Sequence, residues 1–299
     1  MDILSLTESV ASNLLRLSVT QLPQDVKEAL SQAYQKETNP IGKVQLKAIL
    51  DNIRLAADMG RPICQDTGSI NFYLKVHPRF PQVAKIGDAL RKAVRRATSE
   101  VPLRPNAVDP FTQENTCDNV GMCVPYISWE IAEDDYLEIT AFPKGGGSEN
   151  ASALSMMTPG EGPQGIRRFV LDAVIKAGGM PCPPTILGVG IGGGADLSMR
   201  LAKLALLRPL DEPHQEMRIA KLERNLLEAV NSTGIGPMGL GGDSTALGMK
   251  INYAHRHPAS HPVAVVFQCW AARRSTARIY ADRRVEYLTH RASEEEGGN

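Results

Sequence analysis

Cysteines are the side chains in this sequence best suited to bind a metal or to act as nucleophiles, and there are five of them. Three lie at junctions flanked by proline, glycine or tryptophan: Cys64, Cys182 and Cys269. Cys117 and Cys123 lie in a proline-rich stretch. No C-x-x-C pair occurs, which disfavours a zinc knuckle or a zinc ribbon. Each cysteine could instead be a small buried hydrophobe, and that alternative stays open here.

Glycine-rich segments at 145–147, 188–194 and 234–242 form a second group of candidate sites. Glycine lets backbone N–H groups approach an anion closely, so these segments could bind a small anionic ligand, or they could be tight turns between packed elements. The second segment also matches the G-x-G-x-x-G dinucleotide pattern. Because residues 208–214 do not resemble a second parallel strand, a dinucleotide-dependent oxidoreductase is only a distant alternative.

The charge balance and the hydropathy pattern exclude several classes of protein. The 299 residues carry 33 Lys and Arg against 33 Asp and Glu, which argues against a general nucleic-acid binder with a net basic face. No stretch approaches the roughly 18 apolar residues of a membrane span, and the N-terminal residues do not resemble a signal peptide. An odd number of cysteines indicates a reducing compartment, so we expect a cytoplasmic protein without a membrane segment.

Amphipathic periodicity predicts the helices that must position these residues. They span residues 3–17, 23–34, 41–59, 83–98, 164–177, 196–207 and 216–230. The first three are expected to form a helical bundle over about residues 1–60. Residues 101–120 hold three prolines and are predicted to be a long loop, a type of segment that often carries function.

Apolar or alternating runs bounded by turn formers predict the strands. They span residues 70–76, 124–131, 136–142, 185–189, 246–253, 263–267 and 277–280. The second and third are expected to pair as an antiparallel hairpin across residues 133–135. Because helices and strands come in segregated groups, we predict an α+β fold, with a helical N-terminal region followed by mixed helices and short strands. We expect a single domain over residues 1–299, with a frayed tail at about 291–299.

Five motifs together resemble the iron–sulfur hydro-lyase family, which contains the class I fumarases and the L(+)-tartrate dehydratases. They occur in the family's order and span nearly the whole chain. They are PICQDTG at 62–68, KGGGSEN at 144–150, CPP at 182–184, GIGPMGLGG at 234–242 and CWA at 269–271. The resemblance is to the N-terminal region of the one-chain fumarases, or to the α subunit of the two-chain enzymes.

The resemblance implies that Cys64, Cys182 and Cys269 bind a [4Fe–4S] cluster in which one iron is not bound by cysteine. A cluster for electron transfer is normally closed by four thiolates, whereas three leave an open iron that can act as a Lewis acid. Cys117 and Cys123 do not match the family's ligand positions. A cluster of purely structural importance, in a scaffold without activity, is the non-enzymatic alternative.

The resemblance also implies roles in substrate binding and proton transfer. Gln65 and Asp66 correspond to the family's substrate-contacting pair, with Asp66 placed for proton transfer. Arg104 corresponds to a carboxylate-binding arginine, and Gly146 and Gly147 to backbone contacts. The alternatives are a turn-capping role for Asp66 and a surface ion pair for Arg104.

His257 resembles the family's active-site histidine, although His255 and His261 lie close to it in sequence. Further cations, Lys144, Arg273 and Arg274, could bind anions or could be ordinary exposed side chains.

The expected reaction is reversible hydration of a C4 dicarboxylate. KGGGSEN at 144–150 favours fumarate and malate, whereas Trp129 and CWAARR at 269–274 favour L-tartrate as the alternative. The family's remaining catalytic residues, including the hydroxyl that acts as base, belong to a C-terminal region. By this resemblance a partner β subunit carries them, and we expect activity only in a heterooligomer.

Overall fold

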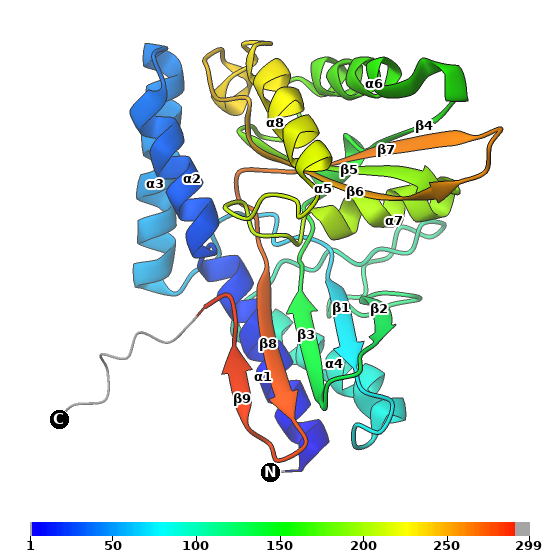
Figure 1. The fold of residues 1–299 in the computed structure, drawn as a ribbon. Coiled ribbons are helices and arrows are strands. Elements are labelled where there is room, and N and C mark those ends of the chain that lie inside the picture. The colour runs from blue at the N-terminus through cyan, green and yellow to red at the C-terminus, as the bar shows by residue number, and fades with distance from the viewer. Residues whose placement is uncertain (1, 291–299) are drawn as a thin grey trace. The chain divides into compact units, whose positions relative to one another are not determined.

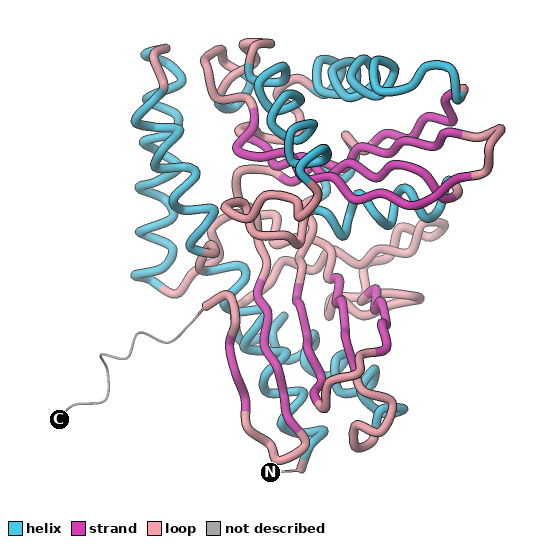
Figure 2. The backbone as a smooth tube through the Cα atoms, viewed as in Figure 1, coloured by secondary structure: helices cyan, strands magenta, loops and turns pink. Residues whose placement is uncertain are grey.

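The computed structural model describes residues 2–290 and divides them into two compact units. Unit 1 comprises residues 2–24, 53–144 and 273–290, and unit 2 comprises residues 25–52 and 145–272. Each unit contains both helices and strands, so the predicted α+β class is confirmed (Figure 2). Each of the two units is discontinuous in sequence. The expectation of a single domain over residues 1–299 stays a prediction. The expected frayed tail lies outside the described residues.

Unit 1 is built on a five-stranded sheet in the order β2-β1-β3-β8-β9 (Figure 1). Its strands are β1 (Asn71–Val76), β2 (Tyr126–Ile131), β3 (Tyr136–Ala141), β8 (Ser275–Tyr280) and β9 (Val285–Tyr287). The predicted hairpin between the second and third strands is wrong. The first strand lies between them, with Leu74 opposite Trp129 on one side and opposite Ile139 on the other. Both edges of this buried strand need backbone partners, and the two neighbouring strands supply them.

Two helices, α1 (Ile3–Thr20) and α4 (Ile86–Glu100), pack with the sheet of unit 1 around one apolar core. Leu14, Leu90, Phe72 and Ile139 in this core are fully buried. The predicted N-terminal helical bundle is therefore wrong in its arrangement, because α1 packs on α4 and on strands of unit 1. Most of α2 (Gln24–Lys36) and the first part of α3 (Pro40–Met59) belong to unit 2.

Unit 2 contains a four-stranded sheet in the order β4-β7-β5-β6, with helices on both faces (Figure 1). The strands are β4 (Ala153–Met157), β5 (Thr185–Gly193), β6 (Ala246–Arg256) and β7 (His261–Gln268). The helices α6 (Gly162–Ala177) and α8 (Met217–Asn231) share a core with alternate residues of β5 and β7. The helix α7 (Ala195–Ala205) packs on the opposite face, where Gly188 and Gly190 lie.

The glycines of the dinucleotide-like pattern lie inside β5 and allow α7 to pack on it. A Cβ at Gly188 or Gly190 would overlap the carbonyl oxygens of residues 202 and 198 in α7. Residues 208–214 form no strand, as expected, but β5 still has a parallel partner, because β6 pairs with it after the intervening helices. The pattern nevertheless serves helix–strand packing here, since its glycines form a strand rather than a phosphate-binding turn.

The remaining segments are short helices and loops. They include α5 (Gly146–Asn150) and the 3-10 turns η1 (Val83–Lys85), η2 (Pro159–Glu161) and η3 (Pro237–Gly239). Residues 101–120 contain no helix or strand, as predicted for a long loop. Within residues 2–290, no helix combines the length and the apolar character needed to cross a bilayer.

Candidate active-site residues

Burial divides the five cysteines into the same two groups as the sequence motifs do. Cys64, Cys182 and Cys269 are half-buried, whereas Cys117 and Cys123 are exposed. All five lie in the described part of the chain, and none forms a disulfide. No sulfur–sulfur bond would therefore have to break before the half-buried sulfurs could bind a metal as thiolates.

Cys182 and Cys269 lie close together in unit 2. The backbone N–H of Trp270, the residue after Cys269, donates to the Cys182 carbonyl (3.2 Å). On the other side, the Met238 N–H of η3 donates to the Pro183 carbonyl (2.8 Å). Cys182 itself adopts a positive φ of 54°, which turns the chain sharply at this point. Three loops thus meet around Cys182.

Glycines allow these loops to approach one another. A Cβ at Gly179 would lie 3.1 Å from the Met238 carbonyl oxygen, and a Cβ at Gly147 would lie 3.3 Å from the Met180 carbonyl oxygen. Gly146 and Gly147 are exposed at the start of α5. Two of the three predicted glycine segments therefore lie beside Cys182, whereas the third forms β5.

A buried carboxylate that no sequence motif predicts stabilises the loop after η3. Glu37, only 2% exposed, accepts hydrogen bonds from the backbone N–H groups of Asn39 (3.1 Å), Asp243 (2.9 Å) and Ser244 (3.1 Å). Because an ionised carboxylate accepts hydrogen bonds strongly, these three contacts fix the far end of the segment 234–242. Glu37 lies far from this segment in sequence, so no local motif pointed to it.

In unit 1, the Cys64–Gly68 segment contacts the long loop. Asp66 Oδ1 accepts from the Gly68 N–H (2.9 Å) and from the Asn106 side-chain amide (3.3 Å). The Thr67 hydroxyl accepts from the Arg104 N–H (3.0 Å) and donates to the Arg104 carbonyl (3.4 Å). The structure thus brings Asp66 and the backbone of Arg104 together. The turn-capping role considered for Asp66 is also present.

The side chains at this place differ in exposure. Gln65 and Arg104 are exposed, and Asp66 is half-buried. Asn106 touches Asp66 but was not identified from the sequence. Its position two residues after Arg104, in a proline-rich loop, is the only local signal that could have pointed to it.

Three cations that could have been exposed are instead buried. Lys144 and Arg273 are each 2% exposed, and Arg274 is 5% exposed. Lys144 pairs through its backbone with Ser69, each N–H donating to the other's carbonyl at 2.9 Å. Arg273 Nη1 donates to the backbone carbonyl of Asp66. The Arg273 contact places positive charge beside the Cys64–Gly68 segment of unit 1.

His257 does not lie near the Cys182–Cys269 pair. It is exposed in the turn between β6 and β7, and β7 runs from His261 at this turn to Gln268, which precedes Cys269. At about 3.4 Å per residue, the eight-residue strand separates its two ends by roughly 24 Å. His261 is buried, and neither of its ring nitrogens has a hydrogen-bond partner among the described residues.

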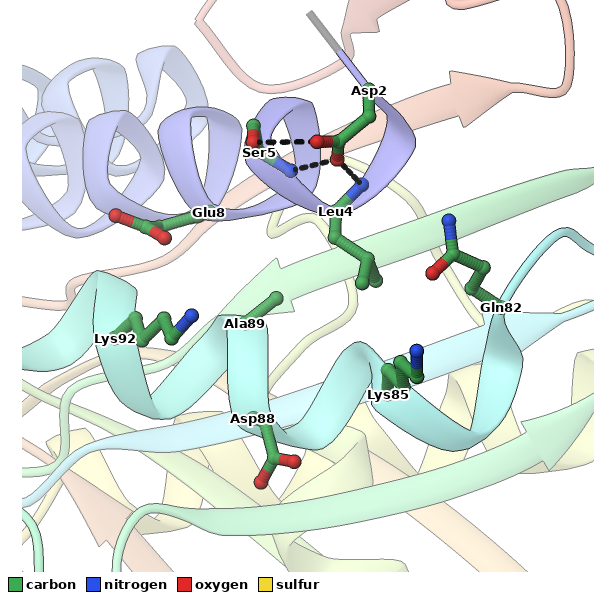
Figure 3. Close-up of a pocket in the computed structure, with 9 residues that line it drawn as sticks. All are labelled: Asp2, Leu4, Ser5, Glu8, Gln82, Lys85, Asp88, Ala89 and Lys92. Atoms are coloured by element: carbon green, nitrogen blue, oxygen red, sulfur yellow. Dashed lines mark hydrogen bonds between the residues drawn. The ribbon is translucent and has the colours of Figure 1, made fainter.

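A groove in unit 1 lies away from all predicted site residues. It runs between α1 and α4 and is lined by charged side chains of both helices, including Glu8, Asp88 and Lys92 (Figure 3). Asp2 at its edge caps α1 by accepting from the N–H groups of Leu4 and Ser5, both at 2.9 Å. The polar contacts of Asp2 at this groove therefore cap the start of α1, and they do not indicate a catalytic site.

The described side chains form no group of three or more His, Cys, Asp or Glu arranged to hold a metal ion. What the structure brings together is the Cys182–Cys269 pair with two glycine segments in unit 2, and the Cys64–Gly68 segment with the Arg104 loop, Lys144 and Arg273 in unit 1.

Known proteins similar to this chain agree on one family. The model of the fumarate hydratase (Fumerase) family matches residues 8–278. A putative L(+)-tartrate dehydratase subunit alpha from Methanocaldococcus jannaschii is 50% identical over 91% of this chain and 97% of its own length. The L(+)-tartrate dehydratase subunits alpha of Escherichia coli K12 and Shigella sonnei are each 40% identical, over 96% of this chain and 95% of theirs.

Proposed function

Because this chain belongs to the fumarate hydratase (Fumerase) family of hydro-lyases, we propose that it is the α subunit of an L(+)-tartrate dehydratase. The observation that carries this proposal is the 40–50% identity to tartrate dehydratase α subunits over more than nine-tenths of the chain. The sequence motifs alone favour fumarate as substrate, with tartrate as the alternative. The similar proteins favour tartrate, so tartrate is now the main proposal and fumarate the second candidate.

The proposed reaction removes water from L-tartrate and gives oxaloacetate. A proton leaves one carbon and a hydroxyl leaves the neighbouring carbon, so the first product is an enol that rearranges to the ketone. The hydroxyl is a poor leaving group, and the proton on carbon is only weakly acidic. The site must therefore assist both departures and must stabilise the negative charge that develops near the carboxylates.

The residues proposed to bind a [4Fe–4S] cluster are Cys64, Cys182 and Cys269. The donor set fits, because all three thiols are half-buried and outside disulfides, and a backbone hydrogen bond links the segments of Cys182 and Cys269. When bound, the cluster would supply a Lewis-acidic iron for the departing hydroxyl. Its sensitivity to oxidants suits the reducing cytoplasm, where we expect the protein.

Other residues of this chain are proposed to bind the substrate and to move the proton. The Asp66 carboxylate is oriented by Gly68 and Asn106 and is proposed to take part in proton transfer. The exposed Gln65 and Arg104 and the N–H groups of Gly146 and Gly147 are proposed to contact the dicarboxylate. His257 lies at the far end of β7 from Cys269, and its catalytic role stays a prediction from the resemblance alone.

A partner β subunit is proposed to supply the remaining catalytic groups. To test this, the chain is purified anaerobically alone and with its β subunit, loaded with iron and sulfide, and assayed with L-tartrate and with malate. We expect turnover only in the complex, and faster with tartrate. Turnover of malate without turnover of tartrate would refute tartrate as the substrate and favour the second candidate, fumarate hydration. A cluster-loaded complex inactive on both would refute the hydro-lyase proposal.

The ligand assignment has its own test. Cys64→Ser, Cys182→Ser and Cys269→Ser should each lower the iron and sulfide bound per chain and weaken the absorbance at about 400 nm. Cys117→Ser is the matched control, since this thiol is exposed and is not a proposed ligand. An unchanged iron content in any of the three variants would refute that residue as a ligand.

A further inference from the structure

Arg273 is a buried cation that has no anionic side chain paired with it among the described residues. It is 2% exposed and lies in the segment of unit 1 that follows Cys269. Within residues 2–290, its one hydrogen bond runs from Nη1 to the Asp66 backbone carbonyl. No Asp or Glu of the described residues forms an ion pair with it, and its buried Nε has no hydrogen-bond partner. The other arginine of the neighbouring strand, Arg278, is paired with Glu138 at 2.8 Å.

An unpaired guanidinium is expensive to bury. Removing a charge from water costs free energy that only a hydrogen-bonded partner of opposite charge restores, so buried charges in proteins are normally paired. A guanidinium keeps its charge in proteins and cannot escape this cost by losing a proton. A buried arginine without an anionic partner is therefore a feature expected of a site that binds an anion.

The geometry of the side chain indicates which anions fit. Nη1 is anchored on Asp66, which fixes the plane of the guanidinium beside the Cys64–Gly68 segment. The edge formed by Nε and Nη2 has no hydrogen bond among the described residues, and this edge presents two parallel N–H groups. Two parallel donors match the two oxygens of a carboxylate.

We propose that Arg273 binds one carboxylate of the dicarboxylate substrate through its Nε–Nη2 edge. This inference rests on the proposed function, and it adds a substrate-binding residue that the sequence motifs left undecided. Because the contact is buried, it should be stronger than one made by an exposed arginine such as Arg104. The Asp66 carbonyl contact would then place the bound carboxylate next to the residue proposed to move the proton.

Arg273→Lys and Arg273→Gln test the proposal in the complex with the β subunit. Lysine keeps the charge but cannot present two parallel donors, and glutamine loses the charge. We expect kcat/KM for the dicarboxylate to fall about 10- to 100-fold, mainly through KM, and further in the glutamine variant. Arg278→Gln is the control, since it removes an arginine that already has a carboxylate partner in unit 1.

A second measurement separates binding from a merely structural role. The thermal unfolding midpoint is recorded against L-tartrate concentration for the wild-type complex and for each variant. A binding residue predicts a largely unchanged midpoint without ligand and a 10- to 100-fold higher tartrate concentration for half-maximal stabilisation. A lowered midpoint without ligand, with the same tartrate response as wild type, would mean that Arg273 only braces the Asp66 loop and would overturn the proposal.

The two proposals fail in different ways. A wild-type complex without turnover on tartrate or malate refutes the proposed function. In that case, stabilisation by a dicarboxylate that depends on Arg273 would still support the anion site. Turnover that is unchanged in both Arg273 variants refutes the anion site and leaves the proposed function standing.

Discussion

Gly68 is the residue at which a single added methyl group should do most damage to the candidate site. Its φ is +89°, a conformation that costs an L-amino acid roughly 1–2 kcal/mol. A Cβ there would lie 2.8 Å from the Lys144 nitrogen, 2.9 Å from the Lys144 carbonyl carbon and 2.9 Å from the Pro143 carbonyl carbon. These are backbone atoms of a paired segment, so they cannot swing away as a side chain could.

The expected loss of stability follows from these two terms. Forcing a methyl group into a packed site typically destabilises the folded state by about 1–3 kcal/mol, and the cost of the positive φ adds to this. Alanine also restricts the unfolded chain more than glycine does, which offsets about 0.4–1 kcal/mol of the loss. We therefore expect Gly68→Ala to lower the free energy of unfolding by about 1–5 kcal/mol. Pushing Lys144 away from Ser69 should also displace Asp66 and lower kcat/KM by at least about tenfold.

Gly60→Ala is a matched control for this change. Gly60 also has a positive φ, +60°, in the same unit, but nothing lies within 4 Å of the position of its Cβ. It should therefore show only the backbone term, about 1 kcal/mol, and keep its activity. Urea unfolding followed by Trp129 fluorescence, in a Trp270→Phe background, reports on unit 1 for both variants. Equal losses of stability in the two variants would refute the close-packing argument.

Three further predictions concern unit 2. Glu37→Gln should lower the free energy of unfolding by about 1–3 kcal/mol in urea titration, because the carboxylate that three backbone N–H groups share becomes an amide; an unchanged midpoint would contradict this. Gln268→Leu should leave the free energy of unfolding unchanged or raise it by about 1–2 kcal/mol, because the amide is 1% exposed and neither of its polar atoms has a partner among the described residues. A decrease of more than about 1 kcal/mol would contradict this, because it would mean that the amide makes a stabilising contact. Burial lowers the pKa of His261, so the neutral form of this side chain is favoured in the folded state. Its contribution to the free energy of unfolding should therefore be complete above about pH 6.5 and decrease as the pH drops below that value. Thermal unfolding from pH 8 to pH 5 measures this, and the decrease should be smaller in His261→Phe.

Local signals predicted the helices well and the sheet pairing poorly. Helix starts are encoded within one turn, as Asp2 before α1 and Pro40 at the start of α3 illustrate. Strand partners are chosen over long sequence distances, so the parallel pairing of β1 with β2 left no local trace. The edge strand β4 was missed because its residues are only partly buried and show no strong apolar run.

The division into two units was equally hidden from the sequence. Both units are assembled from separate segments, so no linker of distinct composition marks a boundary. The same cause limits prediction of the site. Residue types identified the cysteines and the glycine segments, but the contact of Arg273 with Asp66 joins residues 207 positions apart. Whether such a cation is buried or exposed depends on the tertiary fold alone.

Because each unit is assembled from separate segments, the two units become complete at different stages of synthesis. By residue 272 every segment of unit 2 has been made, whereas the sheet of unit 1 still lacks β8 and β9. Until then β3 carries an open edge, and α1 lacks the β8 part of the surface on which it packs. The helix α1 therefore gains its full packing surface only after β8 has been made. Unit 2 can close before β8 and β9 are made, and unit 1 only after them.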